Sequence, residues 1–223
     1  MLYGTSIKPL SRDQVAARVA SDIPEGWYVN LGIGIPTRVA DFIPQEREVV
    51  LHSENGLLGM GGSPEPDRAD PWLINAGKQL VTLRPGGTFF HHADSFSMIR
   101  GGHIDLCILG AFQVSERGDL ANWATSENDA APAIGGAMDL AAGAKRVWVL
   151  MDHVTKDGKP KIKRSCSYPL TAPSCVSRIY SNLAVIDVTP AGLIVVEMVA
   201  GLNFDQLQSA TEAPLLKPSS RPQ

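Results

Sequence analysis

The sequence predicts an α/β fold in which helices flank an open, mostly parallel sheet. Three observations indicate this class. Apolar runs at 49–51, 104–109 and 146–151 suit strands that are buried on both faces. Segments with helical spacing alternate with such runs along the chain, which is the pattern of an α/β protein. Glycine-rich stretches follow several of the runs, where loops leave the strand ends at which open sheets bind ligands.

Capping and breaker residues predict the elements of the first half. Ser11-Arg-Asp-Gln14 has the form of a capping box, and apolar residues follow at helical spacing, so a helix is expected over 11–23. The other elements expected in this half are a strand at 27–31, a short helix at 37–43 stopped by Pro44, a strand at 48–53, short strands at 79–83 and 88–91, and a helix at 94–100.

The second half is predicted in the same way, from apolar runs separated by turn residues. The elements expected there are a strand at 104–109, a hairpin at 112–120, an irregular segment at 121–132, a short helix opening at 135–140, a strand at 146–151, a hairpin turn at 156–158, strands at 184–188 and 193–198, and a last helix capped by Asn203.

Length and composition favour a single domain over 1–223 with a short frayed tail from about 217. The 223 residues can bury a core without disulfides, and the contents of 44% apolar and 19% charged residues are ordinary for a globular protein. The three cysteines are an odd number without metal-ligand spacing, so we expect no metal site and a reducing cytoplasm. No run is apolar and long enough for export or for a membrane span.

The charge distribution argues against a nucleic-acid surface. The net charge is −3, and no cluster of lysine and arginine offers the counterion release on which such binding depends. The nearest candidate, 159–164, contains Pro160 and alternates with apolar Ile162, so an exposed strand is expected there instead. We therefore expect neither nucleic acid nor membrane among the partners.

The strongest functional candidate is Glu54. The apolar run 49–51 predicts the end of a buried strand, and the chain then passes through Ser53-Glu-Asn-Gly56 into a glycine-rich loop. A carboxylate at the end of such a strand is held by a rigid element while it faces a ligand, which suits a nucleophile. The alternative is a glutamate that only opens a solvated Asn-Gly turn.

Several common chemistries fit the sequence poorly. Gly32-x-Gly34 lacks the third glycine of a dinucleotide fingerprint, because Thr37 stands at that position. The chain has neither a P-loop nor a Gly-x-Ser-x-Gly elbow. Cys107 lies within an apolar run and is expected to be an inert core thiol. His91 and His92 are adjacent, and adjacent strand residues point to opposite faces, so metal binding is not favoured.

A glutamate among glycine-rich loops is typical of acyl transfer. Glycine lets backbone N–H groups approach a ligand closely, and the loops at Gly32/Gly34 and Gly135-Gly136 follow strands. A carboxylate that attacks an activated acyl group forms an anhydride or thioester intermediate. Asn30 directly precedes the first glycine loop and is a candidate donor to the developing oxyanion, with turn capping as the alternative role.

Six motifs carry a resemblance to the β subunit of family I CoA-transferases over about 11–207. They are Asn30-Leu-Gly-Ile-Gly-Ile-Pro-Thr37, Ser53-Glu-Asn-Gly-Leu-Leu-Gly-Met-Gly61, Leu73-Ile-Asn-Ala-Gly-Lys78, Arg100-Gly-Gly-His-Ile-Asp105, Gly118-Asp-Leu-Ala-Asn-Trp123 and Gly135-Gly-Ala-Met-Asp-Leu140. The resemblance implies the family's open α/β sheet and a substrate that is a coenzyme A thioester, with no tightly bound cofactor.

The same resemblance assigns roles to individual residues. It implies that Glu54 takes CoA as a glutamyl thioester, that Asn30 helps to form the oxyanion hole, and that Gly135, Gly136 and Ala137 line the pocket for the acyl group and the thioester. The chain lacks the glycine-phenylalanine CoA-binding motif of the α subunit. It therefore resembles half of an enzyme, with an α subunit as its expected partner in an α2β2 assembly.

Within the family, Phe89–Met98, Tyr168–Thr171 and Cys175–Tyr180 resemble the subfamily that acts on 3-oxoadipate with succinyl-CoA. The chain departs from it at Gly62, where proline is usual, and at Ala172, where glycine is usual. A second substrate carboxylate requires cations or donors, for which His91, His92, Arg100 and Arg178 are candidates.

Other functions stay open at this point. A general 3-oxoacid (acetoacetate) or acetate CoA-transferase would share these motifs. A hydrolase or isomerase would use Glu54 as a general base and form no covalent adduct with CoA, and a non-catalytic acyl-CoA sensor would tolerate Glu54→Gln.

Overall fold

The computed structural model describes residues 7–126 and 133–217. The chain forms two compact units. Unit 1 combines Met1–Val15, Ala111–Ile134 and Trp148–Gln223, and unit 2 combines Ala16–Gly110 and Gly135–Val147. The chain thus leaves unit 2 at residue 110, returns for residues 135–147, and leaves again. The single domain expected from the chain length stays a prediction.

Unit 2 contains a mixed sheet whose parallel part holds the candidate residues. Its strands, in spatial order, are β5 (Leu106–Leu109), β1 (Tyr28–Leu31), β2 (Val50–Ser53), β3 (Leu57–Met60) and β4 (Leu83–Phe89). β1 lies parallel to both β5 and β2, whereas β2, β3 and β4 are antiparallel to one another. The central strands β1, β2 and β5 are almost wholly buried, as their apolar runs predict.

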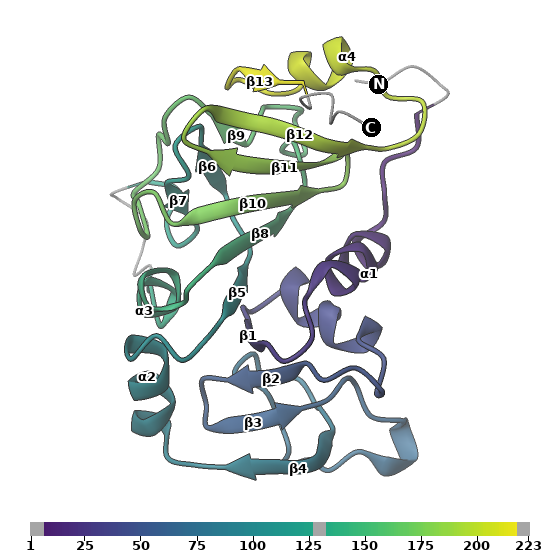
Figure 1. Cartoon of the computed structure of the whole chain (residues 1–223), viewed down its shortest axis with the longest axis vertical. Helices are drawn as coiled ribbons and strands as arrows, with labels where there is room; N and C mark the ends of the chain where they lie inside the picture. The colour runs from purple at the N-terminus through teal and green to yellow at the C-terminus, as the bar shows by residue number, and fades with distance from the viewer. Residues whose placement is uncertain (1–6, 127–132, 218–223) are drawn as a thin grey trace. The chain divides into compact units, whose positions relative to one another are not determined.

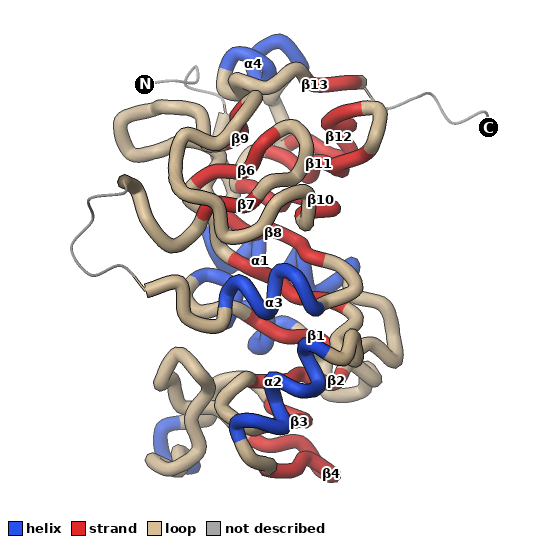
Figure 2. The backbone as a smooth tube through the Cα atoms, turned by 90° about the vertical axis from the view of Figure 1, so that its left-hand side faces the viewer, coloured by secondary structure: helices blue, strands red, loops and turns tan. Residues whose placement is uncertain are grey.

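Helices flank these strands on both sides (Figure 1). They are α1 (Arg12–Asp22), the 3₁₀ helices η1 (Ile35–Phe42) and η2 (Pro66–Arg68), α2 (His92–Arg100) and α3 (Ala137–Gly143). Figure 2 faces the side on which α2 and α3 lie in front of the strands. These two helices pack closely, because a Cβ on Gly143 would come within 2.4 Å of the carbonyl oxygen of Ile99.

Unit 1 is built mainly from antiparallel hairpins. Its larger group of strands runs in the order β13 (Leu215–Leu216), β12 (Gly192–Met198), β11 (Ala184–Thr189), β10 (Val176–Ser181) and β8 (Val147–Met151). A three-stranded sheet contains β7 (Leu120–Ala121), β6 (Gln113–Ser115) and β9 (Ile162–Lys163). The helix α4 (Phe204–Ser209) begins at a capping box formed by Asn203 and Gln206.

A buried histidine ties parts of unit 1 together. His153 has no exposed surface, and its two ring nitrogens each lie 2.8 Å from a hydroxyl, Ser181 Oγ and Thr211 Oγ1. Burial lowers the pKa of His153 to about 4, and the charge of Lys161 adds a smaller effect in the same direction. The imidazole is therefore neutral at pH 7.

The predicted α/β class with an open sheet and flanking helices is confirmed, and so are most of the expected elements. Two expectations were wrong. The strands expected at 79–83 and 88–91 are one edge strand, β4, which tolerates Pro85 because an edge strand can leave a donor unpaired. The loop expected after Gly56 is instead strand β3, and β10 and β13 were not predicted.

Two further expectations concern residues 159–164 and the segments beside the gaps in the described chain. The strand expected over 159–164 is limited to β9, and its Ile162 is fully buried rather than exposed. The second half of the irregular segment expected at 121–132, residues 127–132, and the tail after residue 217 lie outside the described residues. Within the described ranges, no helix combines the length and apolar character needed to cross a bilayer.

Candidate functional site

Glu54 lies in the tight turn between β2 and β3. Ser53 pairs with Leu57, so Glu54, Asn55 and Gly56 form a three-residue hairpin loop. The N–H of Gly56 donates to the carbonyl of Ser53 at 3.0 Å, and Gly56 has a φ of +108°. A three-residue hairpin of this kind ends in a positive-φ residue, which favours glycine. The Asn-Gly pair therefore serves the turn, and Glu54 stands at its start, directly after a buried strand.

Gly56 is required by packing as well as by conformation. A Cβ at this position would lie 2.2 Å from the carbonyl oxygen of Phe90. The backbone N–H of Phe90 donates to the carbonyl of Gly56 at 3.0 Å, which brings the end of β4 against the turn. The turn that carries Glu54 is thus held from one side by the chain that leads into α2.

A second loop holds the turn from another side. The backbone N–H of Ala76 donates to Ser53 Oγ at 3.0 Å, and Asn55 Nδ2 donates to the carbonyl of Ile74 at 2.7 Å. The side chains on both sides of Glu54 are therefore engaged in anchoring the turn. Glu54 itself is partly buried, and none of the described lysines or arginines forms an ion pair with its carboxylate.

Asn30 is brought to Glu54 by the register of the parallel strands. In β1 it lies level with His52 of β2 and with Cys107 of β5. Side chains at the same level of adjacent parallel strands point to the same face of the sheet, and residues two apart on a strand share a face. Cys107, Asn30 and His52 therefore form a row, and Glu54 follows His52 by two residues on the same side.

The amide of Asn30 bridges this row to the glutamate. Its Nδ2 lies 3.0 Å from Glu54 Oε2, 3.3 Å from the carbonyl oxygen of His52 and 3.1 Å from His52 Nδ1. On the other side, Cys107 Sγ lies 3.8 Å from Asn30 Oδ1, within reach of a weak S–H donor. Asn30 is fully buried, so the amide is held among fixed partners. Cys107 is buried as expected for a core thiol.

Sequence reasoning missed His52, which is fully buried directly behind Asn30 and Glu54. Its Nε2 lies 2.8 Å from Ser95 Oγ in α2, and its ring stacks on Phe90 with 6.1 Å between the ring centroids. Burial lowers the pKa of His52 to about 4, so the ring is neutral at pH 7. A histidine inside an apolar run was the only available signal, and that pattern is equally typical of a core residue.

The first glycine loop follows β1 directly. Gly32 has no room for a side chain, because a Cβ would lie 2.9 Å from Leu109 Cδ2 and 3.1 Å from the carbonyl oxygen of Ile108. Gly34 has a φ of +98°, precedes η1, and has open space where a Cβ would stand. Gly32 thus serves strand packing, whereas Gly34 leaves the backbone accessible at the end of the strand that carries Asn30.

The second glycine group begins α3 in the same unit. Gly135 has a φ of +55° with open space around it, and Gly136 is the residue before the helix, which Ala137 starts. A Cβ on Gly136 would lie 2.9 Å from the ring of Phe96, which is next to Ser95 in α2. The group therefore lies beside the helix that contacts His52, but among the described residues no hydrogen bond links it to Glu54.

Two histidines and two arginines were candidates for binding the second carboxylate of a substrate, and all four have structural partners. His91 Nδ1 accepts from the N–H of Ala93 and caps α2, and His92 packs on Phe96. Arg100 Nε lies 2.8 Å from Asp139 Oδ1, which ties α2 to α3. In unit 1, both Nε and Nη2 of Arg178 bond to the carboxylate of Asp187, directly across the β10–β11 pair, at 2.5 and 3.1 Å.

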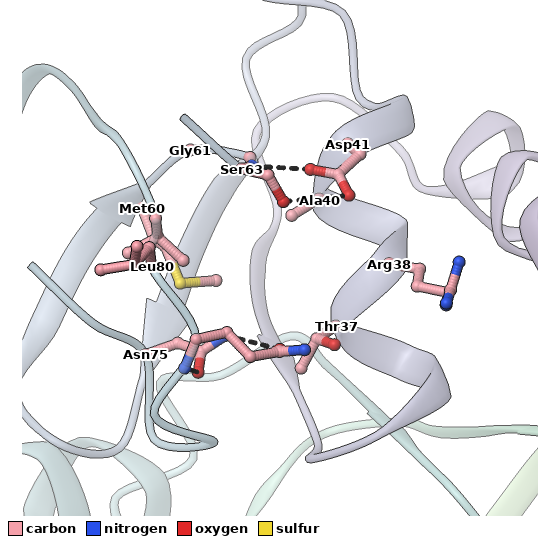
Figure 3. Close-up of a pocket in the computed structure, with 12 residues that line it drawn as sticks. Thr37, Arg38, Ala40, Asp41, Met60, Gly61, Ser63, Asn75 and Leu80 are labelled. Atoms are coloured by element: carbon pink, nitrogen blue, oxygen red, sulfur yellow. Dashed lines mark hydrogen bonds between the residues drawn. The ribbon is translucent and has the colours of Figure 1, made fainter. Parts of the chain in front are cut away.

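A small cavity of about 250 Å³ lies beside the loop at 74–79, and Glu54 is not among its lining residues. Asp41 of η1 is turned toward Ser63, from which it accepts hydrogen bonds at 2.7 Å (backbone) and 3.4 Å (hydroxyl) (Figure 3). Asn75 is similarly bonded to Gln79. Asp41 and Asn75 of this cavity therefore already have hydrogen-bond partners within its lining.

Curated proteins with similar sequences carry names that agree on one reaction class. The chain is 62% identical over 213 residues to the B-type subunit of the 3-oxoadipate CoA-transferase of Pseudomonas putida, covering 96% of this chain and 100% of the relative. It is 59% identical to the protein of the same name from Acinetobacter baylyi, covering 95% and 97%. It is 48% identical to the B-type subunit of the succinyl-CoA:3-ketoacid coenzyme A transferase of Helicobacter pylori, covering 91% and 97%.

Solved structures share the fold at low sequence identity. The apoenzyme of the acyl-CoA transferase YdiF from Escherichia coli O157:H7 matches with a TM-score of 0.73 and 18% identity, over 96% of this chain but only 43% of that chain. A variant of the decarboxylase AibA/AibB matches with a TM-score of 0.70 and 16% identity, over 96% and 88%. The family model described as coenzyme A transferase matches residues 12–210. The chain belongs to the coenzyme A transferase family.

Proposed function

We propose that this chain is the B-type subunit of a CoA-transferase that moves CoA from succinyl-CoA to 3-oxoadipate, with Glu54 as the nucleophile. The names of the relatives at 62% and 59% identity support the reaction and the acceptor. The observation that carries the chemistry is the 3.0 Å contact between Asn30 Nδ2 and Glu54 Oε2 at the end of a parallel strand. It provides a carboxylate and a fixed amide donor at one point.

The reaction proceeds through two intermediates on Glu54. Its carboxylate attacks the thioester carbonyl of succinyl-CoA, the C–S bond breaks, and a mixed anhydride and the CoA thiolate result. The thiolate then attacks the glutamyl carbonyl, which releases succinate and leaves CoA as a thioester of Glu54. The carboxylate of the 3-oxo acid repeats these two steps in reverse order, which yields its CoA thioester and the free glutamate.

Asn30 acts on the oxygen that gains charge in these steps. When the thiolate adds to the glutamyl carbonyl, negative charge develops on a carboxyl oxygen of Glu54, and Asn30 Nδ2 lies 3.0 Å from Oε2. An oxyanion donor is effective at 2.7–3.1 Å from the oxygen that becomes charged, in a site that excludes water. The complete burial of Asn30 meets the second condition.

The glycine loops supply the remaining contacts in this proposal. Gly32 and Gly34 follow the strand that carries Asn30, and Gly135, Gly136 and Ala137 begin the helix beside α2. The backbone N–H groups of Gly34, Gly135, Gly136 and Ala137 bind the acyl group and the thioester of the substrate. The N–H of the buried Gly32 instead donates to the carbonyl of Ile108 at 2.8 Å, so Gly32 shapes the strand end and is not a substrate donor. The chain requires an α-type subunit in an α2β2 assembly to complete the site. It functions in the cytoplasm, where its three free thiols stay reduced.

The relative from Helicobacter pylori supports a second candidate acceptor. Its name refers to 3-ketoacids in general, so a monocarboxylate such as acetoacetate is the competing substrate at the same site. Reaction class and acceptor are thus separate questions. The fold alone decides neither of them, since a decarboxylase also shares it.

The test is a comparison of acceptors with the complex of this chain and its α-type subunit. We expect kcat/KM with succinyl-CoA to be roughly ten- to a hundredfold higher for 3-oxoadipate than for acetoacetate, because an extra hydrogen bond to a charged group contributes about 1.5–3 kcal/mol. Equal values would assign the chain to a general 3-oxoacid CoA-transferase. Hydrolysis of succinyl-CoA without transfer would refute the reaction class.

A further inference from the structure

His52 is a buried imidazole that has no role in the proposed reaction steps. Both ring nitrogens meet polar partners: Nδ1 lies 3.1 Å from Asn30 Nδ2, and Nε2 lies 2.8 Å from Ser95 Oγ. The ring is fully buried and stacks on Phe90. His153 shows that a structural histidine can also have two partners, so the feature that distinguishes His52 is the identity of one of them: Nδ1 contacts the amide that in turn contacts Glu54.

The hydrogen-bonding roles of these atoms follow from their chemistry. An amide nitrogen such as Asn30 Nδ2 only donates, so His52 Nδ1 has to accept, and the ring proton is on Nε2, which donates to Ser95 Oγ. The orientation of the Asn30 amide is itself fixed by two other neighbours. The carboxylate of Glu54 accepts from the NH₂ group, and Cys107 approaches the oxygen.

We propose that His52 is a positioning residue: its unprotonated Nδ1 holds the amide of Asn30 in the orientation that presents an N–H to Glu54. One hydrogen of Nδ2 is directed to Glu54, and the other is shared by His52 Nδ1 at 3.1 Å and the His52 carbonyl oxygen at 3.3 Å. Without an acceptor at the Nδ1 position, only the longer contact to the carbonyl remains on that side, and the amide can turn about its terminal torsion and withdraw the donor from Glu54. The second link, from Nε2 to Ser95, fixes the ring from α2.

This inference rests on the proposed function, because it gives His52 a role only through Asn30. A double-mutant cycle tests it in the complex with the α-type subunit, using wild type, His52→Gln, Asn30→Ala and the double variant. Glutamine fills similar volume and can reach Ser95, but it places no acceptor at the Nδ1 position. We expect His52→Gln to lower kcat about tenfold with KM nearly unchanged, and the double variant to match Asn30→Ala within about twofold.

A conservative variant separates positioning from packing. His52→Asn places an oxygen near the position of Nδ1, so it should lose less kcat than His52→Gln although it gives up the bond to Ser95. A packing role predicts the opposite order, since asparagine leaves the larger void. Thermal unfolding of each complex shows that the variants fold. If His52→Gln does not fold, Ser95→Ala replaces it in the cycle, with a few-fold loss of kcat expected only when Asn30 is present.

Two results would overturn the inference. One is an unchanged kcat in His52→Gln. The other is losses that multiply in the double variant, because His52 would then act independently of Asn30. Formation of a CoA adduct on Glu54 in the same proteins keeps the proposed function standing in either case. The absence of that adduct from active wild type refutes the proposed function, and the role of His52 with it.

Discussion

Replacement of Asn30 by alanine removes the donor that lies 3.0 Å from Glu54 Oε2. In the proposed reaction, this oxygen becomes charged when the CoA thiolate adds to the glutamyl carbonyl. Loss of one such donor lowers kcat by about 10²–10³, or about 2.7–4 kcal/mol. We expect KM to change little, because the hydrogen bond strengthens as the charge develops.

The same substitution also affects stability, which has to be measured separately. It leaves His52 Nδ1 without its donor in a fully buried site, at a cost of roughly 1–3 kcal/mol in the free energy of unfolding. Asn203→Ala is a matched control, because this asparagine caps α4 through its side-chain oxygen in unit 1. It should cost about 1 kcal/mol of stability with no change in kcat.

The assay is steady-state transfer of CoA from succinyl-CoA by the complex with its α-type subunit, combined with urea unfolding of each variant. A folded Asn30→Ala complex with the kcat of wild type would refute the reasoning. Asn30 would then be a strand-end residue whose amide satisfies local hydrogen bonds. A loss of kcat of the same size in Asn203→Ala would equally refute it, since the effect would follow stability rather than the donor.

Three further predictions follow from the structure. The chain assayed alone should show no transfer, and mixing it with an α-type subunit should restore activity; full activity of the single chain would disprove the two-subunit proposal. Gly56→Ala should lower the free energy of unfolding by about 1–3 kcal/mol more than Gly102→Ala. Both glycines have positive φ, but only at Gly56 would a Cβ meet another group, the Phe90 carbonyl oxygen at 2.2 Å. Equal losses of stability in urea unfolding would contradict this. The pKa of His153 is lowered from 6.5 to about 4, so between these pH values the unfolded chain binds a proton that the folded chain does not. The free energy of unfolding should therefore fall as pH falls through this window, by at most about 3 kcal/mol. When it is measured by urea unfolding at several pH values, its dependence on pH should be weaker in His153→Gln.

Local signals made the candidate nucleophile and its turn predictable from sequence. The apolar run before Ser53 and the Asn-Gly pair after Glu54 indicated a strand that ends in a turn, and both features depend on neighbouring residues only. The alternative interpretation, an Asn-Gly turn, agrees with the backbone geometry, because Gly56 closes a hairpin between β2 and β3. The turn and the candidate nucleophile are the same structure.

The network behind Glu54 was not predictable in this way, because it depends on register between distant strands. Asn30, His52 and Cys107 form a row only because β2 and β5 both lie parallel to β1 at the same level. No local pattern fixes that register. His52 therefore looked like one more residue of a core strand. Strand β3 was missed for a related reason, since Gly59 and Gly61 resemble a loop until pairing with β2 and β4 is known.

The most direct measurement is the identification of the residue that carries CoA during turnover. The complex is incubated with succinyl-CoA in the absence of an acceptor, reduced with borohydride, digested and examined by mass spectrometry, with Glu54→Gln treated in parallel. We expect the reduced side chain on the peptide that contains Glu54 in wild type, and no modification in the variant. A fully active complex in which Glu54 stays unmodified, or in which Glu54→Gln still transfers CoA at the wild-type rate, would contradict the assignment of Glu54 as the nucleophile.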